Sequence, residues 1–182
     1  MWLAVFLIAA AATYRLVGHP YNVAPIDAIF LLSALYLPRR GAVVWVFPFA
    51  AVILSDALVY YQWDGSFFRF ARLIDYVAFA LIGVLGLWAK HRGIGARIAA
   101  VFVAPVIFFL VSNFGVWLIA DYGSAALYSR DLDGLLACYL AGLPFFKGTI
   151  IGDLIFAGGG ILLIESSRHS RTVVLRRLAQ PA

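Results

Sequence analysis

Charged residues are scarce in this sequence of 182 residues, and so is cysteine. Asp, Glu, Lys and Arg make up 13% of the chain, while hydrophobic residues make up 64% and the mean hydropathy is +0.96. Soluble domains carry about a quarter charged residues, so the composition excludes an ordinary soluble fold. The single cysteine, Cys138, excludes an intrachain disulfide. The sequence contains no CxxC, HExxH, Walker or Rossmann pattern, so no metal centre, cofactor or enzymatic activity is expected.

What the sequence has instead is a series of apolar stretches. A helix needs about 20 apolar residues to cross a bilayer, and fewer where the bilayer is locally thin. Six stretches are candidates, of which the second is short enough to be tilted or broken: Trp2–Val17, Pro25–Leu37, Ala42–Tyr61, Leu73–Ala89, Arg97–Ala120 and Phe145–Glu165. The segment Gly134–Leu143 is predicted to form a separate short helix that Pro144 ends. We therefore expect an all-α membrane protein, with a six-transmembrane-helix bundle at residues 1–165 and a basic cytoplasmic tail at residues 166–182.

The positions of the basic residues indicate the orientation of this bundle. They gather in three segments beside the stretches: Arg39 and Arg40; Lys90, Arg92 and Arg97; and Arg168, Arg171, Arg176 and Arg177. With six crossings all three segments lie on one face, which the positive-inside rule assigns to the cytoplasm. Both termini are then cytoplasmic. The net charge of +5 reflects this topology, so the predicted partner is the lipid bilayer and not a nucleic acid.

Five ionisable residues fall inside the apolar stretches or at their ends: Arg15, Asp56, Asp75, Lys147 and Asp153. Charged side chains are costly in a bilayer, so each needs a partner or a function. One interpretation is that they brace the bundle as ion pairs, Arg15 with Asp56, and Lys147 with Asp153 or Asp75. Lys147 and Asp153 are six residues apart and face different sides of one helix, so at least one must contact another helix. The other interpretation is direct contact with a ligand.

A further group of polar and aromatic residues maps near the predicted outer face: His19, Asn22, Asn113, Trp117, Tyr139, Phe145 and Phe146. Two prolines stiffen the loop that carries His19 and Asn22. An amide at the depth of Asn113 needs a hydrogen-bond partner. These residues either satisfy one another at the membrane interface or line a ligand pocket. Cys138 is interpreted as a small buried apolar residue, with metal binding through its thiolate as the alternative.

Five motifs together resemble an uncharacterised family of small bacterial inner-membrane proteins: His19-Pro20-x-Asn22-x-x-Pro25-Ile26, Ser55-Asp56, Ser112-Asn113-Phe114-Gly115-Val116-Trp117, Cys138-Tyr139-x-x-Gly142-Leu143-Pro144-Phe145-Phe146 and Gly152-Asp153. In architecture and size the chain is also similar to the substrate-binding S-components of energy-coupling factor (ECF) vitamin transporters. This S-component-like resemblance implies six helices, a pocket toward the outer face and a helix surface that docks an energising module. It also implies the bacterial inner membrane as the location.

Three functions are consistent with these features. The first is binding and uptake of a vitamin- or cofactor-like small molecule, with His19, Asn22, Asn113 and Tyr139 as hydrogen-bonding groups and Trp117, Phe145 and Phe146 as apolar walls. Release inward then needs a partner subunit or a rocking of the bundle. The second is a structural or accessory subunit of a larger membrane complex, without a ligand of its own. The third is an intramembrane enzyme that uses Cys138 or His19, for which no base lies close in the sequence.

Overall fold

Helices form nearly all of the structure. The computed structural model describes residues 2–17, 23–38, 43–65, 67, 72–119, 121–122 and 125–178. Five helices precede a short β-hairpin and a long helical rod. Their bounds are α1 (Trp2–Tyr14), α2 (Ile26–Tyr36), α3 (Val43–Asp64), α4 (Arg72–Lys90), α5 (Ile94–Ile119), β1 (Asp121–Tyr122), β2 (Ala125–Ala126), α6 (Leu132–Asp153), the π-helix η1 (Leu154–Gly158) and α7 (Gly159–Leu178). Strand β1 pairs antiparallel with β2.

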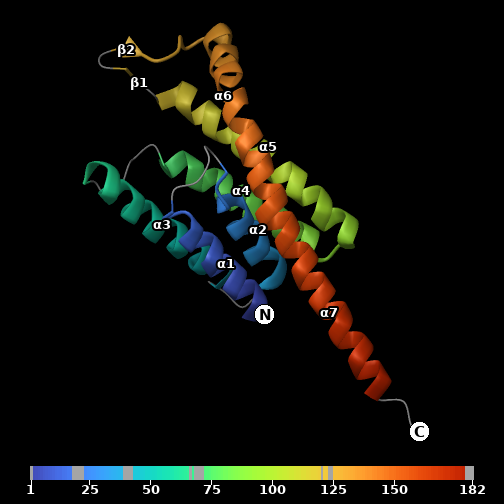
Figure 1. Ribbon diagram of the computed structural model, residues 1–182. Coiled ribbons are helices and arrows are strands. Elements are labelled where there is room, and N and C mark those ends of the chain that lie inside the picture. Colours follow the sequence, from blue (N-terminus) through green and yellow to red (C-terminus); the bar gives the residue numbers. More distant parts are fainter. Residues whose placement is uncertain are drawn as a thin grey trace.

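Four of the helical segments are long and apolar enough to cross a membrane. These are Val43–Gln62 in α3, all of α4, all of α5, and Leu132–Ser170 in the rod, while α1 and α2 are shorter. The prediction of an all-helical bundle that fits a membrane protein is thereby confirmed. The start of α1 and the C-terminal part of the rod lie at the same end of the bundle (Figure 1).

Helix α2 is the core of the bundle. It contacts α1, α3, α4, α5 and η1, and every residue from Asp27 to Tyr36 is buried. A helix that is apolar all round belongs inside a protein, because no face of it suits water. This location explains the short second stretch, since α2 is covered by protein on all sides and need not match the thickness of the lipid.

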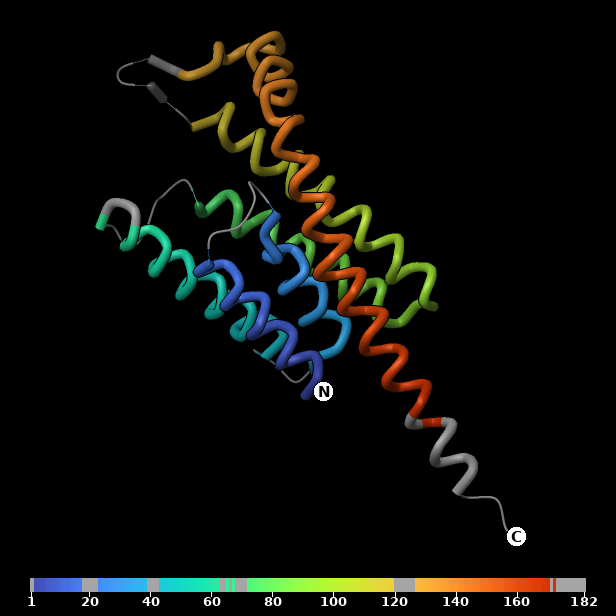
Figure 2. Tube along the Cα trace, in the orientation of Figure 1, coloured from blue at the N-terminus to red at the C-terminus, as the bar shows by residue number. Residues whose placement is uncertain are grey.

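The rod of α6, η1 and α7 corrects one prediction. Pro144 does not end a short helix, because α6 continues through it to Asp153 and then into η1 and α7. The rod crosses the whole bundle as one trace (Figure 2). Proline removes one backbone hydrogen bond, and in apolar helices neighbouring groups and local adjustments compensate for that loss. The helix also continues past Ser166, so the predicted basic tail begins as an extension of the rod.

Polar contacts hold the rod at the end where α7 leaves the bundle. The carboxylate of Glu165 accepts a hydrogen bond of 2.8 Å from the Tyr36 hydroxyl of α2 and forms an ion pair with Arg97 of α5. Arg168 lies 3.6 Å from the same carboxylate. Lys90, Arg97 and Arg168 of the basic segments lie together at this end, and we predict that it faces the cytoplasm.

Candidate functional site

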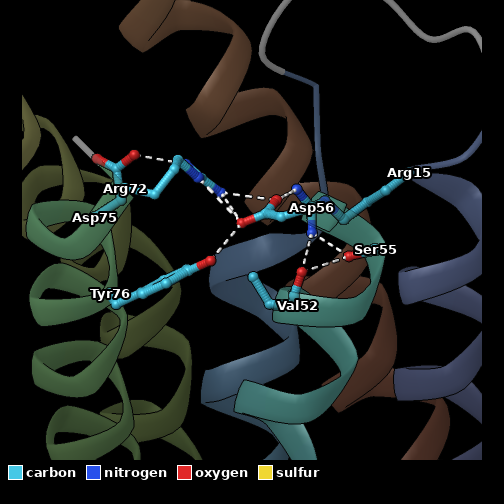
Figure 3. A network of polar contacts seen from close by, with 7 residues as sticks. All are labelled: Arg15, Val52, Ser55, Asp56, Arg72, Asp75 and Tyr76. Atoms are coloured by element: carbon cyan, nitrogen blue, oxygen red, sulfur yellow. Dashed lines mark hydrogen bonds and ion pairs between the residues drawn. The ribbon is translucent and has the colours of Figure 1, made fainter. Parts of the chain in front are cut away.

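At the opposite end of the bundle, a network of charged side chains joins three helices (Figure 3). Its centre is Asp56 on α3, which is 3% exposed. Arg72 on α4 donates to both carboxylate oxygens of Asp56 at 3.0 to 3.1 Å, and the Tyr76 hydroxyl donates at 3.0 Å. Arg15, directly after α1, forms an ion pair with the same carboxylate. The predicted Arg15–Asp56 pair is therefore present.

The other members of the network satisfy the remaining charges. Arg72 donates to Asp75 at 2.5 Å. Arg15 also bonds the Ser55 hydroxyl, and its guanidinium lies 3.3 Å from the carbonyl oxygen of Val52. Two arginines thus face two aspartates, and the formal charge of the group is zero. A buried group of charges that is balanced and hydrogen-bonded holds its helices in register, and it leaves little charge for a ligand.

Lys147 does not take part in the predicted pairs. Its side chain is exposed on α6 and forms no ion pair within the part of the chain that the structure describes. Asp75 pairs with Arg72 and not with Lys147. The prediction missed Arg72, because it lies just before the apolar stretch that begins at Leu73. The three-residue spacing of Arg72 and Asp75 at the start of a helix was the available signal.

A cavity of about 160 Å³ lies between α5 and α6. Three of the predicted ligand-binding residues line it, namely Asn113, Phe145 and Phe146, together with Phe108, Phe109, Ser112, Gly142 and Thr149. The absence of a side chain at Gly142 makes room for the Asn113 amide, because a Cβ there would lie 2.3 Å from its Oδ1 atom. Asn113 donates through Nδ2 to the Phe109 carbonyl oxygen at 2.8 Å.

A second cavity of about 110 Å³ lies beside the first. Its lining includes Asp27 at the start of α2 and Arg72 of the charged network, together with Ala24, Ile26, Phe79, Phe108 and Thr149. Phe108 and Thr149 line both cavities, so the two spaces adjoin at these side chains. The cavities therefore form one row that runs from the Asn113 amide to the Asp27 carboxyl group.

Two predicted ligand-binding residues point elsewhere. The Trp117 indole donates to the Ser129 carbonyl oxygen at 2.8 Å, and the Tyr139 hydroxyl donates to the Leu110 carbonyl oxygen at 2.8 Å. Neither residue lines the two cavities. The Tyr139 bond joins α6 to α5, and the Trp117 bond joins α5 to the segment just before α6. His19 and Asn22 lie outside the described residues.

Cys138 is buried, and its thiol donates to the Asn113 carbonyl oxygen at 3.3 Å. Metal sites of the structural kind need three or four ligands. Among the residues that the structure describes, no group of three or more His, Cys, Asp or Glu side chains is placed to hold a metal ion. The contact with Asn113 instead joins α6 to α5 beside the first cavity.

The partner of Asp153 is a second acidic residue, Asp27. The two acidic side chains interact with each other, both are buried at 1% and 3% exposure, and neither oxygen of Asp153 has a hydrogen-bond donor within the described residues. Gly152 permits the approach, because a Cβ there would lie 3.2 Å from the Ala24 carbonyl oxygen just before α2. Asp153 does contact another helix, as the six-residue spacing from Lys147 requires. Asp27 was missed, although a carboxyl group within an apolar stretch was the signal.

Comparison with known proteins places the chain in a family. Residues 1–171 match the model of a family of unknown function, DUF6580, and the chain belongs to that family. No curated protein and no solved structure matches the chain significantly.

Proposed function

We propose that this chain is a membrane subunit that binds a small molecule at its outer end and takes part in its uptake. The observation that carries this proposal is the row of two cavities between Asn113 and Asp27. It combines aromatic walls with an amide, hydroxyl groups and a carboxyl group at its inner limit. Ligand pockets typically have this composition, with mostly apolar walls and a few polar groups that fix orientation.

The volumes limit the ligand. Cavities of about 160 and 110 Å³ are each close to the volume of about 150 Å³ that holds a benzene molecule. Typical pockets for larger ligands have about 300 to 1,000 Å³. The part of a vitamin- or cofactor-like ligand that enters here is therefore one ring. A longer ligand fills both cavities if the Phe108 side chain moves aside.

The chemistry of the lining favours ligands that donate hydrogen bonds. Arg72 is engaged by Asp56 and Asp75, so it offers little to a ligand carboxylate. The Asp27 carboxyl group has one oxygen without a partner within the described part of the chain. A single-ring solute with amino or ring N–H groups matches this end of the row. By analogy with ECF S-components, we propose that the ligand is released inward either through a docked energising module or through a rocking of the bundle.

The experiment is a thermal-shift screen of the purified protein in lipid nanodiscs against single-ring vitamins. A hit should bind more weakly to Asn113→Ala, by about 3- to 10-fold, because one hydrogen bond is lost. Tyr139→Phe is the matched control, since its hydroxyl lies outside the cavities and its loss should leave affinity unchanged. Equal affinity of Asn113→Ala and the wild type removes Asn113 from the site, and the absence of any hit counts against uptake.

A second candidate function is a structural or accessory subunit of a larger membrane complex. The small volume of the two cavities favours it, because this role predicts no cavity of several hundred Å³ at the outer end. Mild solubilisation of native membranes followed by affinity purification discriminates between the two. A stoichiometric partner together with no bound small molecule supports the accessory role.

A further inference from the structure

Within the described residues, neither Asp27 nor Asp153 of this buried pair has an ion-pair partner. The charged groups that act on Asp27 from the neighbouring helix α4 are Arg72 and Asp75. Arg72 already bonds Asp56 and Asp75, and the Thr149 hydroxyl donates to the Phe145 carbonyl oxygen at 3.4 Å. The pair therefore differs from every other acidic group described inside the bundle, because its closest charged neighbour is the other carboxyl group.

Two ionised carboxylates in this position are strongly unfavourable. Like charges in contact repel each other, and burial adds the loss of hydration. Two carboxylates are also both acceptors, so neither can bond the other. In that state one oxygen of Asp27 and both oxygens of Asp153 have no donor within the described residues. A single proton between the groups removes one charge and supplies a donor, as in enzymes where two aspartates share one proton.

The surroundings favour one remaining negative charge. Asp27 lies in the first turn of α2, where the positive end of the helix dipole stabilises an anion. Asp27 also lines the second cavity, which shares Phe108 and Thr149 with the first cavity beside Asn113. The π-helix η1 begins at Leu154, directly after Asp153, and such irregular turns are frequent at functional positions.

We propose that Asp27 and Asp153 form a proton-binding site, which holds one proton between the two carboxyl groups and exchanges it with the outer cavities. On binding, a proton from water attaches to one carboxylate oxygen and the formal charge of the pair falls from −2 to −1. A divalent cation would need about six or more oxygen ligands, which two carboxyl groups do not supply. Buried acidic residues of this kind serve as proton relays in membrane pumps and transporters.

This site also extends the proposed uptake function, on which the following step rests. A solute that donates a hydrogen bond to Asp27 competes with Asp153 for the same oxygen atoms. Binding of the solute then favours release of the shared proton, and a proton that returns favours release of the solute. Solute binding is thereby coupled to proton release, so the affinity for the solute should fall as the pH falls.

The test is infrared spectroscopy of the full-length protein in nanodiscs at neutral pH, with no solute added. We expect the C=O band of one protonated carboxyl group per chain, with a shift of that band in D₂O. Asp27→Asn and Asp153→Asn should each remove the band, because the remaining carboxylate accepts a bond from the new amide and ionises. Asp133→Asn is the control, because Asp133 is exposed and its loss should leave the band unchanged.

Three results overturn the proposal. These are the absence of the band in the wild type, a band that persists in both variants, and a wild-type band that sodium ions suppress at constant pH. Thermal unfolding of each variant shows whether it is folded, and a folded variant that keeps the band contradicts the assignment. Because no solute is present, the proton site stands or falls independently of the uptake function, which the thermal-shift screen tests.

Discussion

Asp56 and Asp153 are both almost completely buried in the same bundle, with 3% and 1% of their surface exposed. Asp56 faces two arginines and a tyrosine hydroxyl. Asp153 faces another aspartate, Asp27, and has no donor among the described residues. The first arrangement satisfies every charge, whereas the second leaves buried carboxyl oxygens that no described donor satisfies.

The comparison separates a structural from a functional use of the same residue type. Where buried charges are all paired, removing one member strongly destabilises the protein, because the others remain buried and unpaired. A pair that shares one proton responds differently, because replacing one member by its amide keeps both the charge of the pair and a donor for the other member. The effect of a substitution on stability therefore shows which role an acidic residue has.

Asp56→Ala should have the largest effect. It leaves Arg15 and Arg72 without their shared carboxylate, and loss of one partner of a buried ion pair costs about 3 to 5 kcal/mol. The free energy of unfolding, measured by SDS titration in mixed micelles, should fall by that amount. A loss no greater than that caused by Asp133→Asn contradicts the bracing role.

Arg72→Gln should have the next largest effect. Asp56 keeps Arg15 in this variant, but Asp75 loses its partner, and hydrogen bonds to charged groups are worth about 1.5 to 3 kcal/mol each. The same titration measures the change. Arg72→Lys keeps the charge and loses the two-pronged contact with Asp56, so it should fall between Arg72→Gln and the wild type.

Tyr76→Phe should have a smaller effect. It removes one hydroxyl at 3.0 Å from Asp56 and leaves both arginines in place. We expect a loss of about 1 kcal/mol, because single hydrogen bonds inside membrane proteins contribute modestly. A loss as large as that of Asp56→Ala would show that the tyrosine, and not the arginines, holds the carboxylate.

Asp153→Asn should have the smallest effect on stability. Replacing one carboxyl group by an amide of similar shape keeps the single negative charge of the proton-sharing pair and gives Asp27 a donor. The free energy of unfolding should stay within about 1 kcal/mol of the wild type or increase. A loss of stability as large as that of Asp56→Ala would show that the Asp153 carboxyl group is structural and has its bonding partners, as that of Asp56 does.

The sequence predicted those parts of the fold that depend on local composition. Long apolar stretches identified α3, α4, α5 and the middle part of the rod, because a span depends mainly on length and hydrophobicity. The Arg15–Asp56 pair followed from the cost of charge in an apolar stretch, since each needed a partner. Pro144 was misjudged, because the local preference of proline was overridden by the apolar rod around it.

The candidate site could be predicted only in part. Asn113, Phe145 and Phe146 line a cavity, because the motifs that carry them lie on α5 and α6 where these two helices pack together. The pairing of Asp27 with Asp153 depends on the close approach of Gly152 to Ala24. That contact joins residues far apart in the chain, and no local pattern in the sequence specifies it.

The length of the helical rod has a consequence for its place in a bilayer. The segment Leu132–Ser170 has 39 residues, and at 1.5 Å per residue it extends about 58 Å. The hydrocarbon layer is only about 30 Å thick. An upright rod therefore leaves almost half of its length in the headgroup region or in water, where soluble or peripheral molecules can reach it.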